Sequence, residues 1–158
     1  ENRNIPPLRY DDVYRLKREM PDAMIEINGG IKSLDAVAAH LEHVDAVMIG
    51  RAAVDTPYLF AEVDQRFFAS REPVLTREDI VHRMVDYLDD WLRKGEKMHR
   101  ITRHMLTLFA GQPGTRAWKQ WLSQPRDELG PEVLLEGLRR VQEVAAGMSL
   151  RHESSAYL

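Results

Sequence analysis

The sequence predicts a mixed fold, in which an α/β front is followed by an all-α helical bundle. Two short apolar runs, 24–28 and 45–50, flank an alanine-rich segment with helical periodicity. That arrangement is typical of a βαβ unit with two parallel strands. After Gly50 every apolar pattern has helical spacing. We therefore expect a domain boundary near residue 70, which divides the chain into segments 1–70 and 71–158.

Each element of the front has its own local signal. Asp11 or Asp12 is expected to cap an amphipathic helix that Pro21 ends. Ser33 is the expected N-cap of the helix between the two strands. Because Ala46 to Ile49 is continuously apolar, the second strand is expected to be buried on both faces.

The pattern of residues after Gly50 predicts helices only. Pro57 indicates the start of a helix that runs to about Ala69. Thr76 followed by Asp79 indicates an N-terminal capping box, and Gly95 is the expected end of that long helix. The remaining helices are predicted over 97–110, 114–122 and 131–145.

Composition excludes several classes of protein. The chain has 158 residues, of which 44% are hydrophobic, and it contains no cysteine. Without cysteine, these residues provide no disulfide, no thiolate zinc site and no cysteine nucleophile. No apolar run reaches the roughly 18 residues that cross a bilayer, and the first residues lack the basic-then-apolar layout of a secretory signal. These features predict a cytoplasmic protein without membrane contact.

The predicted sheet is too small to stand alone. Two parallel strands leave two unpaired edges and too little surface to bury either face. The missing neighbours come either from a partner chain or from the rest of a larger α/β protein. Because the sequence begins with Glu1 rather than methionine, we expect the second arrangement, in which this chain is a C-terminal portion.

Positive charge is concentrated in one window of an otherwise acidic chain. The formal net charge of the chain is −3, whereas window 91–126 carries eight basic residues and one acid, or +7. A basic segment of this kind predicts binding of a polyanion at one face. A solvated helical face is the alternative. The residues are Arg93, Lys94, Lys97, Arg100, Arg103, Arg116, Lys119 and Arg126, with Glu96 as the acid.

Glycines follow both predicted strands. Asn28-Gly29-Gly30 ends the first strand and Gly50-Arg51 ends the second. Glycine admits a left-handed backbone and close approach of a phosphate to the amides, and an arginine at the next helical turn adds a guanidinium. The pair predicts a phosphate-bearing ligand, as in the loops after strands seven and eight of a (β/α)8 barrel. The alternatives are a hairpin turn at Asn28-Gly29 and an ordinary strand exit at Gly50.

Several motifs resemble those of the tRNA-dihydrouridine synthases, and the resemblance covers nearly the whole chain. The helical segment resembles subgroup A of that family in two further motifs. The family motifs are residues 1–3 (ENR), 5–8 (IPPL), 25–31 (IEINGGI) and 47–53 (VMIGRAA), and the subgroup motifs are 99–106 (HRITRHML) and 114–119 (GTRAWK).

The resemblance implies a flavin TIM barrel with a C-terminal helical bundle, of which residues 1–70 form the last two βα units, so the barrel is incomplete here. It implies FMN as cofactor, NADPH as reductant, tRNA as substrate, reduction of uridine to 5,6-dihydrouridine at D-loop positions 20 and 20a, and a monomer when full length. It implies that the FMN phosphate is bound by Asn28, Gly29, Gly30, Gly50 and Arg51. It also implies that tRNA is contacted by Arg3, Arg116 and Lys119. The family's proton-donating cysteine has no counterpart, so this chain provides no catalytic residue and is expected to be inactive alone.

Two other functions remain open at this point. One is another FMN barrel oxidoreductase that acts on a small substrate, such as an enoate reductase or a dihydroorotate-type enzyme. The other is a non-catalytic helical RNA-binding module. No metal is expected, because His40 and His43 have no third ligand and are better explained as solvated helix surface. Trp118 and Trp121 are expected in the core of the bundle rather than against bases.

Overall fold

The computed structural model describes residues 7–124 and 126–155. The chain divides into two compact units, Glu1–Val54 and Asp55–Leu158, and each is described by itself. The predicted domain boundary near residue 70 stays a prediction, because the compactness of these units does not test where a complete barrel ends. Within the described residues, no helix is both long enough and apolar enough to span a membrane.

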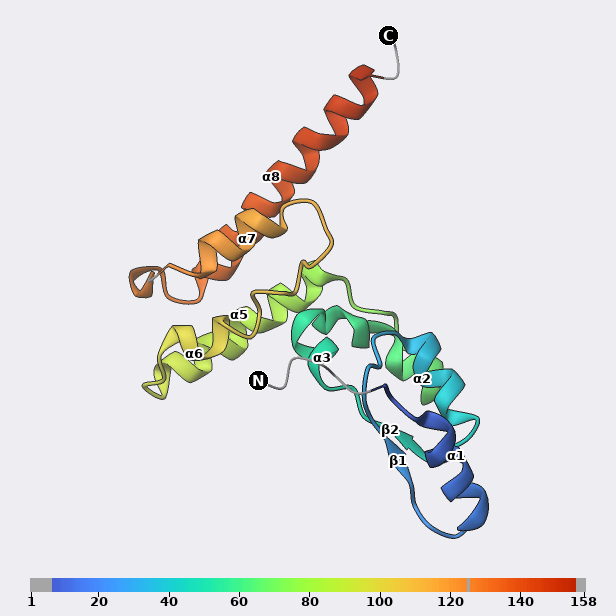
Figure 1. Cartoon of the computed structure of the whole chain (residues 1–158). Helices are drawn as coiled ribbons and strands as arrows, with labels where there is room; N and C mark the ends of the chain where they lie inside the picture. The colour runs from blue at the N-terminus through green and yellow to red at the C-terminus, as the bar shows by residue number, and fades with distance from the viewer. Residues whose placement is uncertain (1–6, 125, 156–158) are drawn as a thin grey trace. The chain divides into compact units, whose positions relative to one another are not determined.

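The first unit contains the predicted βαβ arrangement (Figure 1). Strands β1 (Glu26–Ile27) and β2 (Ala46–Val47) are parallel, with Glu26 opposite Ala46 and Ile27 opposite Val47. Helix α2 (Leu34–Leu41) lies between them in sequence, and the hydroxyl of Ser33 caps it by accepting from the Ala36 amide at 3.1 Å. Helices α1 (Tyr10–Glu19) and α3 (Arg51–Asp55) complete the elements that begin in this unit.

The strands are shorter and less buried than predicted. Ile27 is 2% exposed, but Met48, just after β2, is 43% exposed, so burial of the second strand on both faces is wrong. Among the described residues each strand has one hydrogen-bonded neighbour, so the ladder is confined to the residues around β1 and β2. A wider sheet would be needed to pair and cover the rest of each run.

The start of α1 also differs from the prediction. The N-cap is Arg9, and Asp11 and Asp12 lie inside the first turn. The carboxylate of Asp12 pairs with Arg9 Nε at 2.6 Å, so it is engaged by a side chain instead of capping the amides. Acidic residues in the first turn still favour the helix through its dipole.

Asp45 ties together several segments of the first unit at its surface. Its carboxylate accepts from the Ile25 amide at 2.9 Å and pairs with Lys17 Nζ at 2.8 Å. Lys17 also donates to the carbonyl oxygens of Pro21 and Ala23, each at 2.8 Å. One ammonium group therefore joins α1, the turn that follows it and the start of β2.

The second unit is helical within the described residues. Thr76 and Asp79 form the predicted capping box, since each side chain bonds the other residue's backbone amide. The predicted helix from Pro57 to Ala69 is instead a 3-10 helix followed by a short α-helix. The elements are η1 (Pro57–Glu62), α4 (Val63–Phe67), α5 (Arg77–Arg93), α6 (Met98–Thr102), α7 (Thr115–Leu122), η2 (Asp127–Leu129) and α8 (Glu132–Ser155).

The predicted helix over 97–110 is wrong beyond Thr102. After α6 the backbone runs through consecutive turns to residue 111, held by i to i+3 bonds such as that from the Leu108 amide to the Met105 carbonyl at 3.0 Å. Trp118 Nε1 donates to the Met105 carbonyl at 2.7 Å, and Arg77 Nε donates to the Leu108 carbonyl at 2.9 Å. These side-chain bonds add to the backbone i to i+3 bonds and hold the turns against α7 and α5.

Helices α7 and α8 pack side by side and hold the core of the second unit (Figure 1). Trp118 and Leu134 are fully buried between them. Gly137 allows the close approach, because a Cβ there would lie 2.9 Å from Trp118 Cζ3. Helix α5 packs on the same α8 and adds Val81 and Leu88 to this core.

Candidate functional site

Both glycine turns lie at the same end of the sheet, where the carboxyl ends of the two strands meet. This end is called the edge of the site below. The Met48 amide donates to the Ile27 carbonyl at 2.9 Å, which extends the parallel register past both strands. Asn28-Gly29-Gly30 and Gly50-Arg51 leave β1 and β2 directly after this bond, at their carboxyl ends. Because the strands are parallel and a helix follows Gly30, a hairpin turn at Asn28 is excluded.

The first turn has the left-handed backbone that the prediction required. Gly29 has φ +107° and Gly30 has φ +66°. A Cβ at Gly30 would lie 2.8 Å from Leu8 Cδ1 and 3.1 Å from the Tyr10 hydroxyl oxygen. That hydroxyl donates to the Gly29 carbonyl at 2.6 Å, which orients this peptide group. No motif in the sequence around Tyr10 indicates this contact.

The second turn is open and unstrained. The backbone of Gly50 is outside the left-handed region, so conformational freedom does not explain the glycine at this position. A Cβ at Gly50 would meet no atom within 4 Å. Open space beside a backbone is what an external group needs to reach its amides, so glycine is explained here by access and not by conformation.

Arg51 provides an uncommitted charge at this edge. It is the first residue of α3 and is exposed, and its side chain makes no hydrogen bond or ion pair with another described residue. The Ala53 amide bonds the Gly50 carbonyl at 3.0 Å, which joins the turn to the helix. A guanidinium and accessible glycine backbone are groups from which proteins build anion sites.

A second cationic surface lies on α7. Arg116 and Lys119 are exposed, and neither pairs with a carboxylate in the described part of the chain. The opposite face of the helix is in the core, as predicted, with Trp118 and Trp121 0% and 9% exposed. Trp118 Nε1 bonds the Met105 carbonyl, and Trp121 Nε1 bonds the Val133 carbonyl at 2.8 Å. Both indole N–H groups are thus used in hydrogen bonds within the core, and these bonds hold the outer face of α7 in place.

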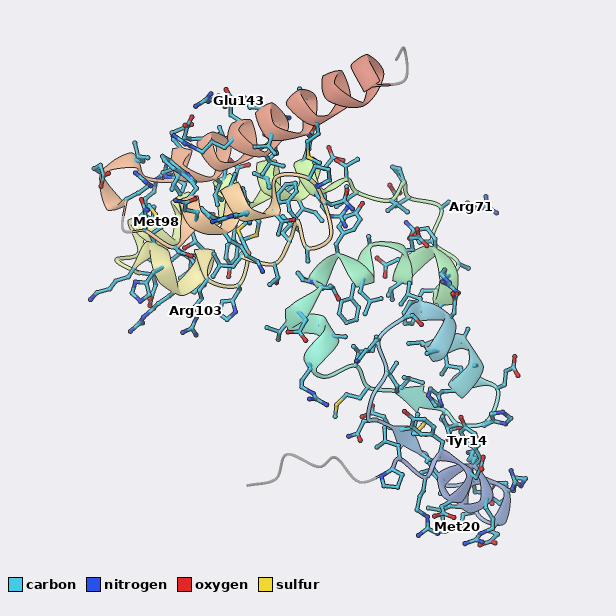
Figure 2. All side chains as sticks on the ribbon, turned by 45° about the horizontal axis from the view of Figure 1, so that its top comes forward. Tyr14, Met20, Arg71, Met98, Arg103 and Glu143 are labelled. Atoms are coloured by element: carbon cyan, nitrogen blue, oxygen red, sulfur yellow. The ribbon has the colours of Figure 1, made fainter. Side chains whose placement is uncertain are left out.

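Several other cations of the basic window make ion pairs or hydrogen bonds with neighbouring side chains. Arg93 pairs with Asp89, and Arg100 pairs with Glu96 at 3.0 Å, so their charges are partly neutralised. Arg103 donates to His104 Nε2 at 3.1 Å, and Figure 2 shows its side chain extending away from the helices. The window is therefore a mixture of paired and free cations, and the free ones include Arg116 and Lys119.

The remaining predicted residues are Arg3 and the histidines His40 and His43. Arg3 lies outside the described residues. His40 is buried, not solvated, because its Nδ1 bonds the Tyr14 hydroxyl at 2.6 Å and its ring packs edge-on against Tyr10. His43 is exposed, as predicted. No cluster of three or more potential metal ligands occurs among the residues that the structure describes.

Comparison with known proteins gives a consistent family assignment. Residues 1–144 match the family model described as Dihydrouridine synthase (Dus). The chain is 48% identical over 141 residues to a tRNA-dihydrouridine(20/20a) synthase of Synechocystis sp., covering 88% of this chain and 42% of that protein. It is 46% identical over 144 residues to the Shewanella oneidensis protein of the same name, covering 90% and 43%. For the Pseudomonas putida protein the identity is 50% over 123 residues, covering 78% and 37%. The chain thus spans about two fifths of the length of these relatives.

Proposed function

Because this chain belongs to the dihydrouridine synthase family, we propose that it is part of an FMN-dependent enzyme that reduces uridine to 5,6-dihydrouridine at positions 20 and 20a of tRNA. The names of the Synechocystis and Shewanella relatives specify these positions. The proton-donating cysteine has no counterpart among these 158 residues. We assign it to the part of the enzyme that this chain does not cover, together with the remaining flavin contacts.

The observation that carries the proposal is the shared edge of the two glycine turns. In (β/α)8 barrels a phosphate site is built by the loops after strands seven and eight, at the carboxyl ends of the strands. Strands β1 and β2 have the parallel order and the turn placement of such a pair. We therefore propose that they are the last two strands of the barrel, with residues 1–70 as its end and 71–158 as the helical tRNA-binding domain.

The residues at this edge fit the phosphate of FMN. Gly29 and Gly30 have backbone angles and neighbours that a side chain would disturb, and the space beside Gly50 is open. Asn28 is exposed at the same turn, and Arg51 has no partner among the described residues. Arg51 would donate charged hydrogen bonds to the phosphate oxygens, and backbone amides would complete its shell. Bound FMN would supply the hydride for the uracil C5=C6 bond and NADPH would restore it.

Arg116 and Lys119 would hold the tRNA backbone. They are neighbours on one face of α7 and carry charge that no described carboxylate neutralises. The buried tryptophans on the opposite face fix the direction in which that charge points. A firm hold on the backbone is required, since a uridine in folded tRNA has to leave its surroundings to reach a barrel mouth. Arg3 is proposed as a further tRNA contact, and the complete enzyme as a cytoplasmic monomer.

The proposal is tested on the complete enzyme with unmodified tRNA. We expect a flavin absorption band in the purified protein and NADPH-dependent formation of dihydrouridine at positions 20 and 20a. A tRNA in which both uridines are replaced by cytidine is the control and should remain unreduced. Purified enzyme without a flavin band, or dihydrouridine that forms only elsewhere in the tRNA, would contradict the proposal.

A further inference from the structure

The cationic face of α7 continues into a second depression. The first depression is bordered by Arg116, Lys119 and Ser123. The second is bordered by His99, Gln124 and Arg126, and Ser123 borders it as well. Its floor is apolar, formed by Met98, Leu122 and Val133. The two depressions are therefore adjacent, and one serine lies between them.

Arg126 is a preformed cation in the second depression. Its guanidinium carbon lies 3.7 Å from the centroid of the Trp121 ring, and one terminal nitrogen donates to the side-chain oxygen of Gln124. Its Nε is buried and has no hydrogen-bond partner among the described residues. No described carboxylate pairs with it. Stacking on an aromatic ring fixes the plane of the guanidinium, so little mobility is lost when an anion binds.

The surroundings of Arg126 favour an anion. None of the described residues that border either depression is acidic. A half-buried guanidinium whose charge no described carboxylate neutralises gains most from a charged acceptor. The second depression has a volume of about 170 Å³, below the roughly 300 Å³ at which pockets for whole small ligands begin. That size suits a single phosphate group.

We propose that Arg126, assisted by His99, binds a phosphate of the tRNA backbone next to the segment held by Arg116 and Lys119. This inference rests on the proposed function and adds a residue to it. Residues 116 and 123 are about 10 Å apart along α7, at about 1.5 Å per residue. The two depressions together thus contact more than one position of a nucleotide strand. Arg126 and a ring nitrogen of His99 supply the donors.

The test compares Arg126→Gln with Arg140→Gln in the complete enzyme. Arg140 is a matched control, because its guanidinium also stacks on Trp121, at 4.0 Å, and its Nε is also buried without a partner among the described residues. Unlike Arg126, it pairs with Glu136 at 2.9 Å. Binding of tRNA is measured over a range of salt concentrations, with melting temperature and retained flavin as checks of folding.

We expect Arg126→Gln to weaken tRNA binding about tenfold and to lower the salt slope by about one, while Arg140→Gln leaves the slope unchanged. An unchanged slope in Arg126→Gln, with a reduced slope in the Arg116→Ala/Lys119→Ala variant, overturns this inference and leaves the proposed function intact. If neither changes the slope, the tRNA-binding role proposed for this domain fails as well. Equal effects of Arg126→Gln and Arg140→Gln assign the loss to Trp121 packing and also overturn the inference.

A second variant covers the case in which Arg126→Gln does not fold. Arg126→Lys retains the charge but loses the planar fork of donors. We expect an unchanged salt slope with binding weakened severalfold. Full affinity in Arg126→Lys would overturn the proposed phosphate contact.

Discussion

Gly137 of α8 faces the ring of Trp118 on α7 so closely that a Cβ would lie 2.9 Å from Cζ3 of the indole. Trp118 cannot move away easily, because it is fully buried and its Nε1 is bonded to the Met105 carbonyl. The contact therefore sets the separation of α7 and α8, and with it the position of the cationic face that Arg116 and Lys119 form.

Replacing Gly137 with alanine should destabilise the protein. Overpacking costs about 1–3 kcal/mol, and alanine returns about 1 kcal/mol through its helix propensity, so we expect a net loss of up to about 2 kcal/mol in the free energy of unfolding. Denaturant unfolding measures it. Gly50→Ala is the control, because a Cβ there meets no atom within 4 Å. Equal stabilities of the two variants would show that the α7–α8 contact is not tight.

Arg51→Ala should weaken FMN binding in the complete enzyme. The charged hydrogen bonds that it would lose are worth about 1.5–3 kcal/mol, which corresponds to an affinity about 10- to 150-fold lower. Flavin retained on a desalting column and equilibrium titration with FMN provide the measurement. Arg15→Ala removes an exposed arginine of α1 that pairs with Glu19 and should leave FMN binding unchanged. Full flavin retention by Arg51→Ala would remove Arg51 from the phosphate site.

Replacing both Arg116 and Lys119 with alanine should weaken tRNA binding and flatten its salt dependence by up to about two units of slope. FMN should stay bound, because the substitutions lie on the exposed face of a bundle helix. The control is Arg93→Ala/Arg139→Ala, which removes two cations that are paired with carboxylates. A tRNA titration in which both double variants show the same slope would argue against a special role for α7.

Acid should release the contact that Asp45 makes in the first unit. The hydrogen bond from Lys17 and that from the Ile25 amide hold the pKa of Asp45 below its ordinary value. A carboxyl group with a lowered folded-state pKa contributes stability above its ordinary pKa, and this contribution disappears as the pH falls through the folded-state pKa. We therefore expect Asp45→Asn to reduce stability at pH 7 and to make stability less dependent on pH below about 4.

The measurement for Asp45 is denaturant unfolding between pH 2.5 and pH 7. Asp22→Asn is the control, since Asp22 is exposed and has no hydrogen bond or ion pair with another described residue. It should follow the unsubstituted protein at every pH. If Asp45→Asn did the same, the carboxylate would contribute nothing through Lys17 and Ile25.

The isolated 158-residue chain should associate or bind a hydrophobic dye. Several apolar side chains are largely exposed, including Met24 at 81%, Phe68 at 73% and Val54 at 71%. Among the described residues, the sheet has two strands and hence two outer edges without a neighbour. Size-exclusion chromatography and dye fluorescence test this. A monodisperse chain that binds no dye and melts in one cooperative transition would show that the chain forms a complete fold.

Local signals in the sequence were sufficient for much of the fold. Ser33 and the Thr76–Asp79 capping box located two helix starts correctly, because a cap depends on residues three positions apart. The βαβ order and the common edge of the two glycine turns also followed from the sequence, since consecutive parallel strands present their carboxyl ends on one side. Arg116 and Lys119 were correctly placed opposite the buried tryptophans by helical periodicity alone.

Tertiary contacts decided the rest, because they come from residues distant in the sequence. The path of the chain after α6 is fixed by Trp118 and Arg77, which donate to the carbonyl groups of Met105 and Leu108. His40 is buried because Tyr14, 26 residues away, bonds its ring. The stacking of Arg126 on Trp121 beside His99 likewise exists only after α6 and the end of α7 have packed together. Periodicity and capping report what a segment does by itself, whereas the partners of a buried polar group are chosen by the packed fold.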